Sequence, residues 1–258
     1  MSEKQRSAAV VNLNHVKAAC KDCSLKELCL PLGLTESDLS HLEKAIKRSR
    51  RHEKGEFIYR IGDELQGLYA IRSGSVKTSE IGREGHIQIT GFHLPGELLG
   101  VDAISTDKHP CDAVALERTE VCEIPLDKLE DLARSIPGLQ HQLLRIMSRE
   151  IVEDEALLMM LGKMSAEARL AACLMSFSDR FKRLGAGGET FRLTMSRQDL
   201  GDYLGLALET VSRLFSRFQE EGLIRVEGRK ITLLDVEGLR ALSGDSDGPG
   251  GSRQRPVA

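Results

Sequence analysis

Residues 196–222 read SRQDLGDYLGLALETVSRLFSRFQEEG, and this stretch decides the fold of the C-terminal third of the chain. Ser196 followed three residues later by Asp199 is typical of a helix start, and Gly205 is suited to end that helix. A second helix is expected over about residues 208–220. Two short helices joined at a glycine turn predict a helix-turn-helix, in which the second helix reads DNA.

The second helix of this motif has an apolar and a polar face. Its apolar positions, at i, i+3, i+4 and i+7, are Val211, Leu214, Phe215 and Phe218, and its polar face carries Glu209, Ser212, Arg213, Ser216 and Arg217. Arginine can donate two hydrogen bonds to guanine and glutamate can accept one from cytosine, so we predict Glu209 and Arg213 as base readers with Ser212 between them. Arg217 is predicted as a further DNA contact. The alternative is a Glu209–Arg213 surface pair that stabilises the helix by about 0.2 to 0.5 kcal/mol.

The segments around this motif complete a C-terminal domain. A helix is expected over about residues 166–184, followed by a glycine-rich loop. Residues 224–226 and 230–233 flank a turn that contains Gly228, which predicts a β-hairpin that would form a wing. The tail from Ser243 has the composition of a disordered segment.

The N-terminal part has a different sequence pattern, with one short helix followed by short strands. A short helix is expected from Thr35 to Ile46, with Asp38 in its first turn. From about Gly55 to Pro125, short runs of alternating apolar and polar residues are separated by glycines. Such short and regularly interrupted strands predict a β-roll or jelly roll.

A long helical pattern follows from about residue 139. Its heptad positions, four and three residues apart, are Met147, Ile151, Asp154, Leu158 and Leu161. This spacing is typical of a two-helix seam, although the helix could instead pack on its own domain. A carboxylate at Asp154, within the acidic residues 153–155, would weaken a symmetric dimer through desolvation and like-charge repulsion. We therefore predict a weak and adjustable homodimer.

Three cysteines form a cluster near the N-terminus. The six cysteines are Cys20, Cys23, Cys29, Cys111, Cys122 and Cys173. The first three can reach one centre, and a fourth ligand would complete a four-thiolate site for an iron–sulfur cluster or a zinc ion. Cys173 has the apolar surroundings of a buried inert thiol. Local pattern leaves Cys111 and Cys122 as open candidates for the fourth ligand.

Composition and net charge limit the classes of protein to which the chain can belong. The chain has 258 residues, 41% of them hydrophobic, and a net charge of −3. These values exclude wholesale disorder, and the chain shows no long apolar window or apolar N-terminal signal core, so we expect a cytoplasmic protein with no membrane partner. Residues 1–162 carry a net charge of −5 and residues 163–258 a net charge of +2, which allows nucleic-acid binding by the C-terminal third.

Several motifs together resemble one family. They are the spacing Cys-x2-Cys-x5-Cys and the runs at residues 68–74, 89–93, 121–125 and 209–213. Over about residues 15–235 the chain resembles the FNR/Anr branch of the CRP/FNR transcription regulators. The resemblance implies an α+β fold with an iron–sulfur segment (1–30), a cyclic-nucleotide-binding-like β-roll (31–138), a dimerisation helix (139–163) and a winged helix-turn-helix (164–242). The tail that composition predicts to be disordered (243–258) follows these parts.

The same resemblance implies a mechanism. It selects Cys122 as the fourth ligand of an oxygen-responsive 4Fe–4S cluster, together with Cys20, Cys23 and Cys29, and it makes Cys111 incidental. The intact cluster would favour a homodimer bound to a TTGAT-N4-ATCAA-like palindrome, and oxygen would convert the cluster and release the DNA. Glu209, Ser212 and Arg213 match the family's DNA-reading positions, and Asp154 matches its acidic seam position. The loop at residues 82–85 resembles a contact with RNA polymerase, with a solvated turn as the alternative.

Two departures from the family pattern are informative. Residues 95–100 resemble part of a cyclic-nucleotide phosphate cassette, but residues 110–113, Pro-Cys-Asp-Ala, replace the downstream arginine and hydroxyl residue. The acid would repel a phosphate, so we predict no cyclic nucleotide binding. Ala207 stands where relatives often have a capping Ser or Thr, a change that typically costs about 0.5 to 2 kcal/mol.

Other classes fit the sequence less well. An iron–sulfur enzyme would need an acid/base or nucleophile set, and the chain has no dinucleotide fingerprint or P-loop, so we predict that it is not an enzyme. A zinc-stapled DNA-binding protein and a cAMP-dependent activator are the remaining alternatives.

Overall fold

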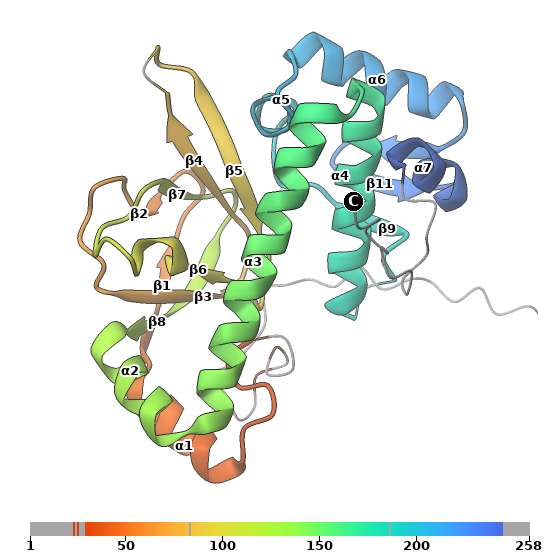
Figure 1. The fold of residues 1–258 in the computed structure, drawn as a ribbon. Coiled ribbons are helices and arrows are strands. Elements are labelled where there is room, and N and C mark those ends of the chain that lie inside the picture. Colours follow the sequence, from red (N-terminus) through yellow and green to blue (C-terminus); the bar gives the residue numbers. More distant parts are fainter. Residues whose placement is uncertain (1–22, 24, 26–28, 83, 186, 245–258) are drawn as a thin grey trace, which may run out of the picture.

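The computed structural model describes Cys23, Leu25 and residues 29–82, 84–185 and 187–244. Its fold is α+β, as the sequence predicts. A β-rich domain and a C-terminal helical domain lie on either side of the long helix α3 (Pro137–Lys163), as Figure 1 shows.

The β-rich domain is a roll of two four-stranded antiparallel sheets, with strand orders β1-β8-β3-β6 and β2-β7-β4-β5. Its elements are β1 (Lys47–His52), β2 (Phe57–Tyr59), β3 (Gly67–Ser73), β4 (Val76–Ile81), β5 (Ile87–His93), β6 (Leu98–Leu99), the 3-10 helix η2 (Val101–Ala103), β7 (Asp112–Ala115) and β8 (Thr119–Pro125). The roll expected from about Gly55 is therefore present, and it begins one strand earlier. Strand β1 was not expected because it is rich in basic residues, which suit a sheet edge, and its pairing with β8 is a tertiary feature.

Two short helices close one end of the roll. Helix α1 (Glu36–Ala45) begins at the predicted capping box, in which the Asp38 amide donates to Thr35 Oγ1 and the Thr35 amide donates to Asp38 Oδ2. Helix α2 (Leu126–Ser135) follows β8 directly and was not expected. A core shared by both helices, β3, β8 and α3 contains Leu30, Leu42, Leu68, Ala70, Leu98, Ile124, Leu129, Ile136, Leu139 and Ile146.

Helix α3 starts at Pro137, two residues before the expected position, because proline suits a first turn where an amide has no helical partner. Met147, Ile151 and Leu158 are 38%, 60% and 71% exposed. Asp154 is also exposed, and Leu161 is partly buried. Most of the predicted seam therefore lies open on the surface of the protomer rather than packed on its own domain.

The C-terminal domain contains the predicted helices and hairpin. Its elements are α4 (Ala166–Arg183), β9 (Thr190–Arg192), α5 (Arg197–Leu204), α6 (Leu208–Glu220), β10 (Ile224–Glu227), β11 (Lys230–Leu233) and α7 (Val236–Ser243), with sheet order β10-β11-β9. The glycine-rich segment after α4 contains strand β9, which pairs with β11 and was not expected. Strand β9 is only three residues long, which is too short for a recognisable sequence pattern.

The expected start of the tail at Ser243 is wrong. Asp235 caps α7 by accepting from the Gly238 amide at 2.8 Å, and Leu239 of this helix is fully buried. Ser243 is the last residue of α7, where its hydroxyl donates to the Arg240 carbonyl at 2.8 Å and is buried. A local cap and one buried leucine thus extend the ordered domain to Gly244, and residues 245–258 lie outside the described part.

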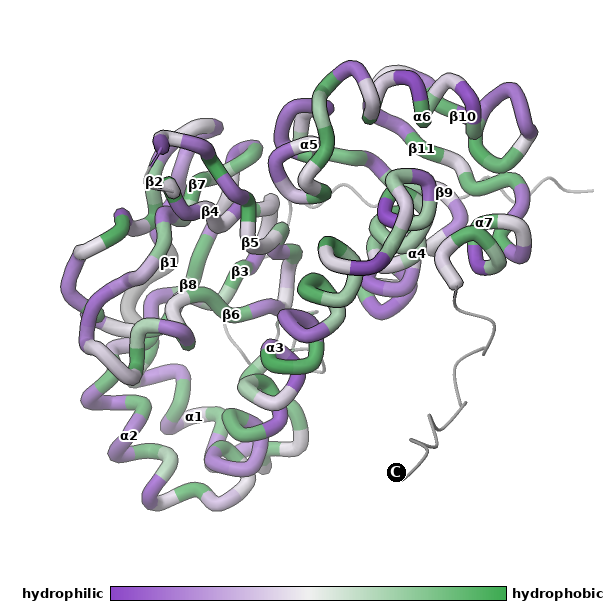
Figure 2. Tube along the Cα trace, turned by 45° about the horizontal axis from the view of Figure 1, so that its top comes forward, coloured by the Kyte–Doolittle hydropathy of each residue, from purple (hydrophilic) through white to green (hydrophobic). Residues whose placement is uncertain are grey.

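The two domains share one hydrophobic core. Four residues of the β-roll, Ile89, Phe92, Leu94 and Leu116, belong to the same buried cluster as the core of the C-terminal domain. The ring of Phe92 lies 5.1 Å from that of Tyr203 and 6.0 Å from that of Phe177. Figure 2 shows hydrophobic and hydrophilic residues alternating along α3 and α6, as expected for amphipathic helices. The helix-turn-helix is therefore packed against the roll.

Candidate functional site: DNA-reading helix and cysteine pocket

The two ends of α5 are formed by residues predicted from the sequence, and the turn that follows packs closely against a glycine of this helix. The Asp199 amide donates to Ser196 Oγ at 3.0 Å and the Ser196 amide donates to Asp199 Oδ2 at 2.7 Å, which forms the predicted capping box. Gly205 ends α5 with φ of 63°, in the left-handed region that favours glycine. A Cβ atom on Gly201 would lie 2.6 Å from the Leu206 carbonyl oxygen, so the turn can only approach α5 this closely over a glycine.

Helix α6 presents its polar face to solvent. The four apolar side chains Val211, Leu214, Phe215 and Phe218 are buried, as predicted, and the five polar ones, Glu209, Ser212, Arg213, Ser216 and Arg217, are exposed. Ala207 is the N-cap and makes no side-chain capping hydrogen bond. No ion pair joins Glu209 to Arg213 among the ion pairs of the described residues.

Arg217 differs from Arg213 in its environment. Its Nε donates to Glu221 Oε1 at 2.7 Å, and its Nη1 donates to Glu167 at the start of α4. In the free protomer this arginine therefore ties α6 to α4. A DNA phosphate would have to compete with two carboxylates for its charge.

Three of the four predicted cluster ligands line one pocket. Cys23, Cys29 and Cys122 share it with the residues Leu25, Leu30, Pro31, Leu42, Ile46, Ala70, Ile71, Arg72 and Ile124. Cys122 is positioned on β8, where it pairs with Ala70 of β3. Cys20 lies outside the described residues.

The other two cysteines lie elsewhere. Cys111 is buried against Tyr59 and its neighbours in the interior of the roll, where its thiol donates to Asp102 Oδ2 at 3.4 Å. Cys173 is buried on α4 in the shared core, and burial raises the pKa of its thiol to about 12. The prediction of a buried inert thiol at Cys173 agrees with this position.

The cysteine pocket disfavours thiolates unless a cation is present. Burial raises the pKa of the Cys122 thiol, the Cys23 thiol and Glu120 act in the same direction, and Arg72 opposes them. Within the described part of the chain, no three His, Cys, Asp or Glu side chains converge closely enough to hold a metal ion. Thiols in a mostly apolar pocket fit a positively charged metal centre, which binds thiolates and offsets their negative charge. Three cysteines are one ligand short of the four that an iron–sulfur cluster takes.

The long helix α3 contacts the cysteine segment directly. Gln142 of α3 is only 3% exposed, and its Nε2 donates to the Cys29 carbonyl oxygen at 3.3 Å. Leu139 and Ile146, one turn before and after it, pack in the core beside the pocket. We did not single out Gln142 from the sequence, although a glutamine between two apolar positions of one helix face is a usable signal for a buried polar contact.

The segment that resembles a phosphate cassette is engaged by the protein itself. Glu97 accepts from Arg180 Nε at 2.9 Å and from Arg180 Nη2 at 2.5 Å. Asp112, in the downstream segment, accepts from the Ile61 amide at 2.8 Å. Both carboxylates of this region therefore already have partners in the free protomer.

Comparison with family models gives two matches. Residues 49–135 match the cyclic nucleotide-binding domain and residues 168–242 match the Crp-like helix-turn-helix domain. Both agree with the observed roll and helix-turn-helix. No helix in the described part of the chain has the length and apolar character needed to cross a membrane.

Comparison with characterised proteins gives relatives along most of the chain. The transcriptional activator protein Anr of Pseudomonas protegens is 49% identical over 90% of this chain and 95% of its own length. The fumarate and nitrate reduction regulatory protein of Yersinia pestis is 48% identical over 88% of this chain and 90% of its own length. Among solved structures, FixK2 from Bradyrhizobium japonicum matches with a TM-score of 0.70 and 31% identity, over 76% of this chain and 96% of that one.

Proposed function

The chain belongs to the FNR/Anr group of CRP/FNR transcription regulators, and on that premise we propose that it is an oxygen-responsive homodimer whose 4Fe–4S cluster controls DNA binding. The observation that carries the proposal is the pocket shared by Cys23, Cys29 and Cys122 in a chain that also has a solvent-facing recognition helix. One relative, from Haemophilus influenzae, is named an anaerobic regulatory protein, which supports a response to oxygen.

The cluster ligands are proposed to be Cys20, Cys23, Cys29 and Cys122. When bound, an iron–sulfur cluster would supply an oxygen-sensitive centre held by thiolates. Arg72 lines the same pocket and acts to lower the pKa of Cys122, so it favours the thiolate form of that ligand. The Cys111 and Cys173 thiols are too far into other cores to take part.

The dimer is proposed to form along the exposed face of α3, through Met147, Ile151, Asp154, Leu158 and Leu161. Apolar side chains that are 38–71% exposed on one helix are suited to burial against a second copy. Gln142 and the core around it connect this helix to the Cys29 segment. A change in that segment would therefore act on α3, and a coupling of about 1 to 3 kcal/mol is enough to change a dimerisation equilibrium many-fold.

The DNA site is proposed to be a TTGAT-N4-ATCAA-like palindrome read by two copies of α6. Glu209 and Arg213 would contact base edges, with Ser212 between them, and Arg217 would contact the backbone. The hairpin between β4 and β5 projects from the roll (Figure 1), and its Glu84 is 86% exposed, which suits a proposed contact with RNA polymerase in the cytoplasm.

We also propose that the protein binds no cyclic nucleotide. Glu97 is occupied by Arg180, and the downstream segment offers Asp112 and no cation to a phosphate. Cyclic AMP is expected to leave the melting temperature and the DNA affinity unchanged.

The decisive experiment measures DNA affinity of one preparation before and after exposure to air. Protein purified without oxygen should be brown, contain iron and acid-labile sulfide, and bind the palindrome more tightly than random DNA. Exposure to air should bleach it, reduce the iron content and weaken binding to the palindrome. A colourless zinc protein whose affinity is the same in air would reject oxygen sensing and favour the zinc-stapled alternative.

A further inference from the structure

We propose that Arg180 of α4 and Glu97 of the β-roll form a clasp that holds the helix-turn-helix in the orientation required to read DNA. The inference rests on the proposed DNA-binding function and adds a positioning pair to it. Neither residue lies on the recognition helix or in the cysteine pocket. They would therefore act on DNA affinity only through the relative orientation of the two domains.

The contact has the geometry of a strong ion pair. Arg180 Nε donates to Glu97 Oε1 at 2.9 Å and Nη2 donates to Glu97 Oε2 at 2.5 Å, and Nη2 also donates to the Phe92 carbonyl oxygen. The two side chains are only 12% and 23% exposed. A bidentate pair fixes both the distance and the direction of approach, which a single hydrogen bond does not.

Arg180 and Glu97 each stabilise the ionised form of the other. Burial acts to raise the pKa of the Glu97 carboxyl, but the charge and hydrogen bonds of Arg180 hold it below its ordinary value. Burial acts to lower the pKa of Arg180, and Glu97 raises it above its ordinary value. Both groups are thus ionised at neutral pH, and removal of one would leave the other charge buried without its partner.

The clasp also lies beside the helix proposed to form the dimer. Glu150 and Glu153 of α3 are close enough to Arg180 and Glu97 for these charges to shift their pKa values. Arg180 is therefore placed where the β-roll, α3 and the C-terminal domain meet.

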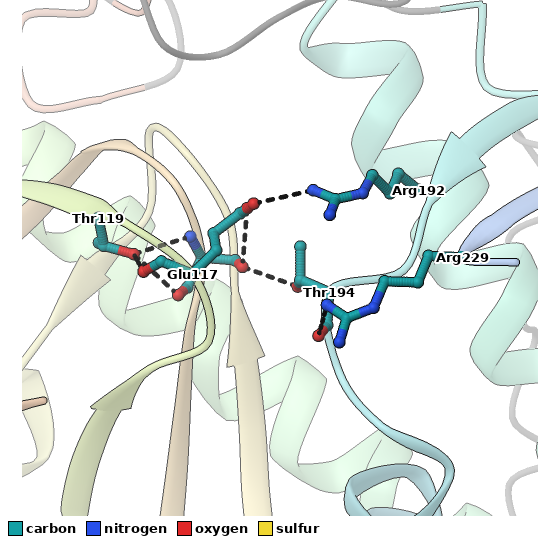
Figure 3. A network of polar contacts seen from close by, with 6 residues as sticks. Glu117, Thr119, Arg192, Thr194 and Arg229 are labelled. Carbon is teal, nitrogen blue, oxygen red and sulfur yellow. Dashed lines mark hydrogen bonds and ion pairs between the residues drawn. The ribbon is translucent and has the colours of Figure 1, made fainter. Parts of the chain in front are cut away.

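Other polar contacts also join the two domains. Figure 3 shows one group, in which Arg192 Nη1 donates to Glu117 Oε2 at 3.2 Å and Thr194 is linked to the roll by a 2.7 Å hydrogen bond with Ser75. The Arg192 side chain is 56% exposed, so water competes for this pair. The Ser75–Thr194 hydrogen bond is buried, but neither it, the Arg192–Glu117 pair nor the Lys77–Asp199 pair has the two parallel hydrogen bonds of the clasp.

Arg180 lies on the helix that follows a short connection after α3, so its contact with Glu97 can fix the orientation of the C-terminal domain. Between α3 and α4 only Met164 and Ser165 are non-helical, and both have extended backbone. Rotation at these two residues would turn α4 and, with it, α5 and α6 relative to the roll. A dimer must place two recognition helices in two half-sites at a fixed spacing, so loss of one orientation lowers affinity without loss of any DNA contact.

The test compares variants of the full chain that remove one charge each, in two measurements. Spin labels at the exposed Lys54 and Glu220, introduced as unnatural amino acids to leave the native thiols intact, report the distance between the domains by pulsed electron resonance. We expect a single narrow distance in the unsubstituted protein, and a broad distribution in Glu97→Gln and Arg180→Gln. DNA affinity should fall about tenfold in each single variant.

Two further variants separate positioning from general destabilisation. The double variant Glu97→Gln/Arg180→Gln should lose no more affinity than either single one, because both remove the same contact, whereas independent effects would multiply. Arg180→Lys keeps the positive charge but cannot donate the two parallel hydrogen bonds of a guanidinium. Its distance distribution and DNA affinity should therefore lie between those of the unsubstituted protein and Arg180→Gln.

Glu117→Gln is the matched control, since it removes an interdomain ion pair that is exposed, and it should leave the distance distribution narrow. A narrow and unchanged distance in both clasp variants would overturn the clasp, whatever their DNA affinity. If the unsubstituted protein fails to bind the palindrome, the proposed function fails, and the distances still decide for or against the clasp.

Discussion

Lys77 Nζ on β4 donates to Asp199 Oδ1 on α5 across 2.6 Å, so an ion pair joins the β-roll to the first helix of the helix-turn-helix. The two side chains are 24% and 15% exposed. The same aspartate closes the capping box of α5 with Ser196. One carboxylate therefore both caps the start of the helix and holds the helix against the β-roll.

The first prediction concerns this carboxylate. Asp199→Asn should lower the free energy of unfolding at pH 7 by about 1 to 2 kcal/mol, because it weakens a cap and removes an ion pair. Burial acts to raise the pKa of Asp199, but Lys77 and Ser196 hold it below 3.8. The stabilisation is present above the unfolded-state pKa and is lost as the pH falls through the lower native value.

Urea unfolding of both proteins between pH 7 and pH 3 checks this prediction. The difference between Asp199→Asn and the unsubstituted protein should shrink as the pH falls. Asp202→Asn, one turn along the same helix, is the control and should have a small effect at all pH values. A constant difference across the range would contradict the role of the charge.

The second prediction concerns the start of α6. Ala207 is its N-cap, with φ −64° and ψ 147°, and it has no side chain able to accept from the first turn. Ala207→Ser should stabilise the protein by about 0.5 to 1 kcal/mol, since a serine hydroxyl can accept one of the unpaired amides. Thermal unfolding measures the gain, and Ala207→Gly, which has no acceptor, is the comparison. A serine variant no more stable than the glycine variant would speak against a missing cap.

The sequence predicts the helix-turn-helix well because its signals are local. Ser196, Asp199 and Gly205 define α5, and the apolar spacing from Val211 to Phe218 defines the buried face of α6; the structure confirms both helices with the predicted bounds. The wing hairpin depends on one glycine turn and is confirmed as well. The roles of the site residues on α6 and in the cysteine pocket stay predictions.

Features that depend on distant partners were not predictable. Strands β1 and β9 exist because they pair with β8 and β11, and β1 is too basic to be read as a strand from its own residues. Glu97 and Arg180 are 83 residues apart, and nothing near either one indicates the other. The net charge of the whole chain was likewise uninformative, because it combines an acidic N-terminal part with a mildly basic C-terminal part.

The third prediction separates two cysteines of the β-roll, Cys111, which is buried, and Cys122, which is partly buried. Cys122→Ser should lose iron and acid-labile sulfide from anaerobically purified protein, because this thiol lines the pocket with Cys23 and Cys29. Cys111→Ser should keep both, since Cys111 lies in the interior of the roll beside Tyr59. Iron and sulfide per chain, with circular dichroism to verify folding, provide the measurement. Equal iron content in the two variants would remove Cys122 from the ligand set.

The fourth prediction distinguishes two arginines of α6. Arg213→Ala should cost about 1 to 3 kcal/mol on the palindrome and relax one base position, as expected for a bidentate contact to guanine. Arg217→Ala should weaken binding to all sequences to a similar extent and reduce the salt dependence by about one unit, as expected for a phosphate contact. Titrations with cognate and random DNA at several salt concentrations measure both. Equal losses on both DNAs for Arg213→Ala would reject its base-reading role.

The fifth prediction uses the acidic residues of α3. Burial, followed by Glu153, Glu97 and Asp154, raises the pKa of Glu150 to about 7, although Arg180 opposes the shift. The native protein therefore holds a proton that the unfolded chain releases above pH 4.5, so the contribution of Glu150 to the free energy of unfolding falls as the pH rises from about 4.5 to 7.

Glu150→Gln removes this penalty, because the amide remains uncharged at every pH. The variant should match the unsubstituted protein near pH 4.5 and exceed it by roughly 1 to 3 kcal/mol above pH 7, in proportion to the shift of the carboxyl. Urea unfolding from pH 5 to pH 8 measures the difference, and Glu155→Gln, at an exposed position of the same helix, controls for the removal of one negative charge. If both variants gain equally with pH, the effect comes from net charge. If only Glu150→Gln gains, the partly buried Glu150 carboxylate, near the junction of α3 with the clasp, is the cause.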